Sequence, residues 1–92
     1  MINGNVNEFI DGLYYGDERF FFYAGNKYFL QGYYVNGSPM LEVYTIGNSK
    51  VNFEWRMISD NGEYPVAVFE SAKIFDGKSF WEVEKEIEWV DC

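Results

Sequence analysis

The sequence predicts an α+β fold, a four-stranded antiparallel meander sheet flanked by an N-terminal helix and two short C-terminal helices. Three observations support this prediction. Four runs with strand-like alternation occupy residues 19–59, and the turn sequences AGN, NGSP and GNSK separate them. The segments on either side carry apolar residues at helical spacing. With 92 residues, the chain is expected to form one domain, 1–92.

The first predicted helix spans residues 5–14. Its apolar residues recur at intervals of three and four, which places them on one helical face. They are Val6, Phe9, Ile10, Leu13 and Tyr14. Asn5 is a favourable N-cap, and Glu8 suits the positive end of the helix dipole. Gly16 is expected to end the helix, because glycine readily adopts the left-handed conformation of a C-cap.

The four predicted strands are RFFFY, KYFLQGYYV, MLEVYTI and VNFEWRMIS. Asn36-Gly37 is the strongest hairpin pattern, because both residues tolerate positive φ. Gly32, inside the second strand, indicates a bulge or the close approach of another backbone. In the fourth strand, simple alternation places one set of side chains toward the core and the other set toward solvent. The core set is Val51, Phe53, Trp55 and Met57, and the solvent set is Asn52, Glu54 and Arg56.

Two further helices are expected after the sheet. One spans about 64–73, where Pro65 suits a first helical turn. Residues 79–91 have two interpretations. Ser79 to Glu82 form a capping box, which favours a helix, while alternating glutamates favour a strand. We expect a helix over 79–87 and an extended 88–91. Helices at both ends of the meander should cover one sheet face and leave the other at least partly open.

Charge, cysteine content and the lack of targeting patterns restrict the partners, the disulfides and the cellular location that we expect. Acidic residues outnumber basic ones 15 to 7, for a net charge of −8. Phosphate binding needs clustered Lys and Arg, so we expect neither direct nucleic-acid binding nor a membrane partner, but a basic protein surface. The single Cys92 allows no intrachain disulfide, and its role is left open. Without a signal-peptide pattern or a long apolar run, a cytoplasmic location is expected.

No catalytic, cofactor or metal motif emerges from the residues. The chain contains no His, which removes the usual base of nucleophilic triads and the commonest metal ligand. Gly77-Lys78-Ser79 imitates a P-loop, but Ala72 stands where the motif needs glycine, so a turn and helix cap explain it better. The acidic pairs Asp17/Glu18 and Glu42/Glu54 are better explained as solvated charge. We therefore expect no enzyme, no cofactor and no metal.

Aromatic residues and late glutamates are the candidate contact groups. Nine Phe, eight Tyr and three Trp exceed what a small core encloses, so some Tyr should face outward. Depending on strand register, the outward set is Tyr28/Tyr34/Tyr44 or Phe29/Tyr33. The acidic run near the end forms either a solvated face or a ridge for a basic groove. The candidate partner-binding residues are Glu82, Glu84, Glu86, Glu88, Asp91, Tyr33, Tyr44, Glu42 and Glu54.

Two stretches carry a resemblance, LYYGDERFFFYAGNKYFLQGYY and IFDGKSFWEVEKEIEWVD. Together they resemble small bacterial and mobile-element proteins of no settled activity, in the size class of anti-CRISPR and toxin-immunity proteins. The resemblance implies a non-enzymatic inhibitor bound to a larger, often basic, partner. We therefore expect an acidic binding protein that blocks a nucleic-acid-binding surface as a DNA mimic does. The alternative is a homo-oligomeric structural domain, a homodimer for instance, that pairs through an exposed aromatic sheet face.

Overall fold

The computed structural model describes residues 1–47 and 49–90. Its helices and strands confirm the α+β class and follow the order α1 (Val6–Leu13), β1 (Arg19–Tyr23), β2 (Asn26–Val35), β3 (Ser38–Ile46), β4 (Val51–Ile58), α2 (Val66–Ser71), α3 (Phe80–Val83), the 3₁₀ helix η1 (Glu84–Glu86) and β5 (Glu88–Val90). Asp91 and Cys92 lie outside the described residues.

The sheet has five strands in the order β4-β3-β2-β1-β5, with every neighbouring pair antiparallel. The four-stranded prediction is therefore wrong by one strand. The extended conformation expected late in the chain is confirmed for 88–90, and this segment pairs with β1, Trp89 lying opposite Phe21. The pairing joins segments far apart in sequence, and strand propensity alone does not specify such a partner.

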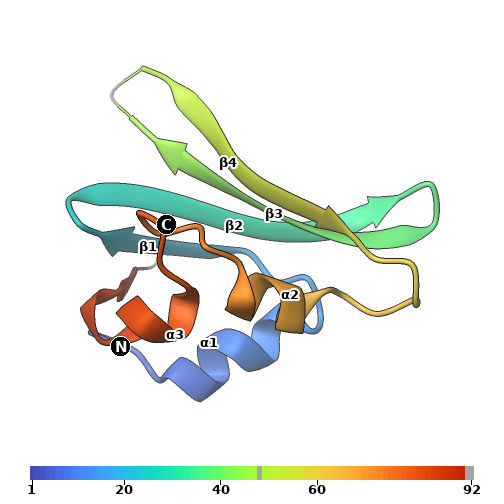
Figure 1. Cartoon of the computed structure of the whole chain (residues 1–92), viewed down its shortest axis with the longest axis horizontal. Helices are drawn as coiled ribbons and strands as arrows, with labels where there is room; N and C mark the ends of the chain where they lie inside the picture. The colour runs from blue at the N-terminus through green and yellow to red at the C-terminus, as the bar shows by residue number, and fades with distance from the viewer. Residues whose placement is uncertain (48, 91–92) are drawn as a thin grey trace.

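The helices lie on one side of the sheet, as expected, and the hairpin of β3 and β4 extends beyond them (Figure 1). The first helix begins where the sequence predicts. The side chain of Asn5 accepts hydrogen bonds from the backbone N–H groups of Asn7 and Glu8, at 2.9 and 3.1 Å. This cap satisfies donors that have no partner inside the helix and so fixes the start of α1.

The two later helices are shorter than predicted. The helix expected over 64–73 is reduced to α2, and the helix expected over 79–87 divides into α3 and η1. The capping box is confirmed, because the backbone N–H of Ser79 donates to Glu82 Oε1 at 2.9 Å. The glutamates that follow sit at spacings where like charges repel in an α-helix, which is consistent with its early end.

The core lies between the helices and the sheet and is built largely from aromatic rings. Phe9 of α1 contacts Phe21 of β1, Phe80 of α3 and Trp89 of β5, with ring centroids 5.4 to 5.6 Å apart. Phe69 of α2 continues the cluster, 5.5 Å from Phe80. Such aromatic pairs contribute about 0.5–1.5 kcal/mol each beyond their area of burial. The cluster thus ties all three α-helices to the sheet.

A β-bulge in β4 overturns the simple alternation expected for this strand. Val43 pairs with Trp55, but Tyr44 pairs with Phe53, so Glu54 is an extra residue. The bulge places Phe53 on the sheet face away from the helices, where it is 57% exposed. The prediction that Val51 and Phe53 face the core is therefore wrong, whereas Arg56 is exposed as expected. Trp55 does face the helices, and its ring lies 5.9 Å from Phe69.

Gly32 confirms the expected close approach. A Cβ at this position would lie 2.7 Å from Tyr64 Cε1 and 2.8 Å from the backbone Cα of Gly16. We expect Gly32→Ala to lower the free energy of unfolding by about 1–3 kcal/mol, because backbone atoms must move to admit the methyl group. Urea denaturation measures this loss. The control is Gly47→Ala, where the nearest atom is 3.5 Å away. Equal losses in both variants would contradict the contact.

Candidate functional site: the open face of the sheet

We call the sheet side opposite the helices the open face, because no helix in the described part of the chain crosses it (Figure 1). The strand register sets its side chains in rows that run across the sheet. Its most exposed apolar members lie on three different strands. They are Phe22, Tyr33, Val51, Phe53 and Ile58. Contiguous exposed apolar surface on a small protein commonly marks a site of interaction.

One row of the open face is aromatic. Phe20, Phe29, Tyr44 and Phe53 are successive partners across β1, β2, β3 and β4. The rings of Phe20 and Phe29 lie 4.8 Å apart, and those of Tyr44 and Phe53 lie 5.9 Å apart in an edge-to-face arrangement. Cross-strand aromatic pairs stabilise a sheet, and here they also leave ring surface uncovered.

The neighbouring row is polar and is formed by Gln31, Glu42 and Arg56. Glu42 is only 1% exposed although it lies on the open face. Gln31 Nε2 donates to Glu42 Oε1 at 2.7 Å, and Arg56 Nη2 donates to Glu42 Oε2 at 3.0 Å. The Tyr44 hydroxyl donates to the same Oε2 at 3.0 Å. The carboxylate is therefore covered by its own hydrogen-bond donors rather than by a helix.

These contacts determine the charge at the centre of the open face. Burial alone would raise the pKa of Glu42, but hydrogen bonds from Gln31, Arg56, Tyr44 and Tyr33 outweigh burial, and the pKa lies below its ordinary value. The hydrogen bond to Glu42 raises the pKa of Arg56. Both groups are therefore ionised at neutral pH. A carboxyl with a lowered pKa is poorly suited to donate protons, whereas a fixed ion pair is suited to orient a partner.

The structure brings together three of the predicted contact residues and separates a fourth from them. Tyr33, Tyr44 and Glu42 share the open face, and the Tyr44 hydroxyl turns inward to donate to the carboxylate. Glu54, at the bulge, accepts instead from Thr45 Oγ1 at 2.9 Å, on the side that faces the helices. The pair Glu42/Glu54 thus does not form a common site. Of the two outward sets, Phe29/Tyr33 lies on the open face, whereas Tyr28/Tyr34/Tyr44 is divided, because Tyr28 is buried in the core.

The late glutamates mostly have partners within the chain. Lys73 Nζ lies 3.2 Å from Glu82 Oε1, and the amino group of Met1 lies 2.8 Å from Glu84 Oε2. Glu88 accepts from Asn3 Nδ2 at 2.8 Å. The hydrogen bond from the backbone N–H of Ser79 is the main cause that lowers the pKa of Glu82, and the hydrogen bond from Lys73 lowers it further. Glu86 is exposed on η1, and Asp91 lies outside the described residues.

Sequence reasoning missed Arg56 and Gln31 as parts of the site. One pattern could have indicated them, namely an acidic residue, Glu42, inside the otherwise apolar strand MLEVYTI. A carboxylate at the centre of a sheet needs donors on the neighbouring strands, because a buried charge without them is strongly destabilising. The cross-strand neighbours on each side are the residues to search for such donors.

Comparisons with protein-family models, with curated proteins and with solved structures found no match to this chain. Across residues 1–47 and 49–90, no helix is long and apolar enough to cross a membrane. The same residues contain no group of three or more His, Cys, Asp or Glu side chains placed to hold a metal ion. Fold and site together define a small acidic α+β domain with an aromatic open face around an ion pair.

Proposed function

We propose that this chain is a small, acidic, non-enzymatic binding protein whose open face docks on a larger basic protein. The observation that carries the proposal is the exposed aromatic surface around the Glu42–Arg56 ion pair. Protein interfaces are enriched in Tyr, Phe and Arg, and their strongest contacts combine aromatic anchors with orienting charges. Arg56, 44% exposed, is available to a partner while Glu42 holds its position.

Net charge selects the class of partner in this proposal. A charge of −8 steers the protein toward a basic surface and speeds association at low salt. A nucleic-acid-binding effector has such a surface, and occupying it would inhibit that effector as a DNA mimic does. Glu86, exposed on η1, is the late acid that best supports the DNA-mimic proposal, while Glu88 is partly buried and accepts a hydrogen bond from Asn3. Glu82 and Glu84 support it less, because both already form ion pairs within the chain.

A second candidate is a homodimer formed through the same face, and one observation favours it. Lys27 and Arg56 lie on the open face with Glu42 and Glu88, so its formal charges balance although the whole chain is acidic. Because the open face carries as many positive as negative side chains, two copies could meet through it without a net repulsion between the two faces. Size-exclusion chromatography with light scattering from micromolar to millimolar concentration separates the candidates. A monomer throughout favours a foreign partner, and a dimer that Phe53→Ala weakens favours self-association.

The partner proposal is tested by affinity capture from a bacterial lysate, with wild-type and Phe53→Ala baits washed at low and then high salt. We expect the wild type to retain proteins more basic than the lysate average and Phe53→Ala to lose them. Trp81→Ala is the matched control, because Trp81 is an exposed aromatic residue on α3 and not on the open face. Captured proteins of average charge, or equal capture by wild type and Phe53→Ala, would refute the proposal.

A further inference from the structure

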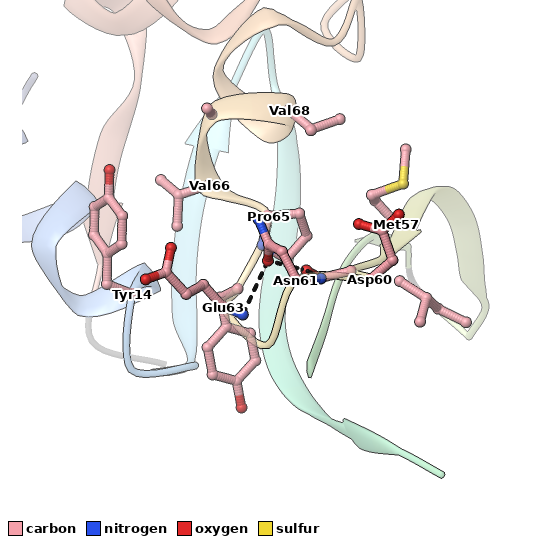
Figure 2. A pocket seen from close by; sticks show the side chains of 12 residues that line it. Tyr14, Met57, Asp60, Asn61, Glu63, Pro65, Val66 and Val68 are labelled. Carbon is pink, nitrogen blue, oxygen red and sulfur yellow. Dashed lines mark hydrogen bonds between the residues drawn. The ribbon is translucent and has the colours of Figure 1, made fainter. Parts of the chain in front are cut away.

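A groove lies where the loop after β4 leads into α2. Its first compartment, about 340 Å³, has an apolar wall that includes the exposed side chains of Met57 and Val68. Figure 2 shows Tyr14 and Glu63 on one side of this compartment and Met57 and Asp60 on the other. The compartment thus combines aliphatic surface with two carboxylates.

A second compartment, about 480 Å³, adjoins the first and is mainly aromatic. It is lined by Tyr14, Tyr15, Tyr34, Gly62, Glu63 and Tyr64. Tyr14, Glu63 and Tyr64 line both compartments, so the two form one continuous site, which we call the tyrosine groove. The rings of Tyr34 and Tyr64 meet edge to face at 5.8 Å. Tyr15 is 80% exposed, so its ring is available to a ligand.

The tyrosine groove is preformed. The Tyr64 ring is seated against two glycines, because a Cβ on Gly16 or on Gly32 would come within 2.6 or 2.7 Å of it. Asn61 holds the adjoining loop, since its Oδ1 accepts from the backbone N–H of Glu63 at 3.0 Å and from Ser59 Oγ at 2.6 Å. A site whose residues are already ordered costs less entropy on binding.

The electrostatics of the tyrosine groove have one sign. Among the described residues, no Lys or Arg lines either compartment. Asp60 and Glu63 form no ion pair with any part of the chain that the structure describes. Aromatic rings present negative faces, which attract Lys and Arg side chains, and the two carboxylates add to that attraction. A cation with an alkyl stem matches both halves of the groove, its charge near the rings and its stem on the aliphatic wall.

We propose that the tyrosine groove binds a Lys or Arg side chain of a basic partner protein. The alkyl stem lies against Met57 and Val68, and the charged end lies among the tyrosine rings beside Glu63. This inference deepens the proposed function and rests on it for the basic character of the partner. It adds a second contact, which meets the open face at Ile58 and recognises individual cationic side chains.

The test is an NMR titration of the whole chain with N-acetyl-arginine amide and N-acetyl-lysine amide at low salt. We expect shifts confined to Tyr14, Tyr34, Tyr64 and their neighbours, with a dissociation constant on the order of 1 mM or weaker, as suits so small a probe. N-acetyl-norleucine amide lacks the charge and should bind about three- to tenfold more weakly, the range expected from a cation–π contact and an exposed carboxylate. Equal binding of the norleucine probe would overturn the proposal.

Matched variants identify the contacts. Tyr34→Ala and Glu63→Gln should each weaken binding of the arginine probe about two- to fivefold. Glu86→Gln, which removes the same charge from η1, should leave it unchanged. Equal weakening by Glu86→Gln would show diffuse attraction to an acidic protein and overturn the inference, as would shifts spread over the whole surface.

Phe53→Ala separates this inference from the proposed function. The variant changes the open face and leaves the tyrosine groove intact, so binding of the arginine probe should persist in it. Loss of partner capture by Phe53→Ala with unchanged probe binding supports both sites. Probe binding by a chain that captures no basic protein supports the tyrosine groove and refutes the proposed function. Capture without probe binding refutes the tyrosine groove alone.

Discussion

Phe9→Ala is expected to lower the free energy of unfolding by about 3–5 kcal/mol, the largest effect of any single change considered. Phe9 has no exposed surface and contacts rings from β1, α3 and β5. Truncation therefore leaves a cavity where three elements meet. Small domains have only about 5–15 kcal/mol of total stability, so the loss should be plain in urea denaturation followed by tryptophan fluorescence.

The matched control is Phe22→Ala, which removes the same atoms from the open face. Phe22 is partly exposed, so its loss should cost less than about 1 kcal/mol. Similar losses in the two variants would mean that the rings around Phe9 are not the shared core of the helices and the sheet. A large loss in Phe22→Ala alone would mean that the open face is covered.

Glu42→Gln is expected to lower stability at neutral pH by about 1.5–3 kcal/mol, because it removes charge-assisted hydrogen bonds from a buried group. The effect should depend on pH. The folded pKa of Glu42 lies below its unfolded value, so the ionised carboxylate stabilises the fold fully above the unfolded pKa, about 4.3. That stability is lost as pH falls through the lower folded pKa. The difference between wild type and variant should therefore shrink below about pH 4.

Urea denaturation midpoints measured from pH 7 down to pH 3 check this expectation. Glu86→Gln serves as the control, because Glu86 is exposed on η1 and its replacement should produce neither the loss nor its pH dependence. A stability difference for Glu42→Gln that stays constant over the whole pH range would attribute the loss to packing and contradict the role given to the ionised carboxylate.

The local parts of the fold could be predicted because their determinants are close together in sequence. Asn5 caps α1 through donors two and three residues away, and Ser79 pairs with Glu82 within one turn. The pairing of β5 with β1 could not be predicted in this way. It joins Trp89 to Phe21, and nothing in either segment specifies the other. The bulge at Glu54 was missed for a related reason, since it appears only in the register between two strands.

The candidate site could be predicted only in outline. The excess of aromatic residues correctly required some of them to face outward, and Tyr33 and Tyr44 lie on the open face. The position of Glu42 was not foreseen, because its burial depends on donors from β2 and β4. The tyrosine groove was also missed, since it assembles residues from three separate segments around Tyr64. Such sites depend on tertiary contacts and leave only weak traces in any one stretch.

The extra residue in β4 determines which side chains lie on the open face before the bulge and which lie there after it. Before the bulge the odd positions, Val51 and Phe53, share the open face, and after it the even positions, Arg56 and Ile58, do so. Deleting Glu54 would leave a regular alternation in which Phe53 still lies opposite Tyr44 and Trp55 opposite Val43, so neither half of the strand would have to rotate. Such a deletion would remove the local kink and the hydrogen bond from Thr45 to Glu54, while the side chains of the other residues of the strand would keep their sides of the sheet.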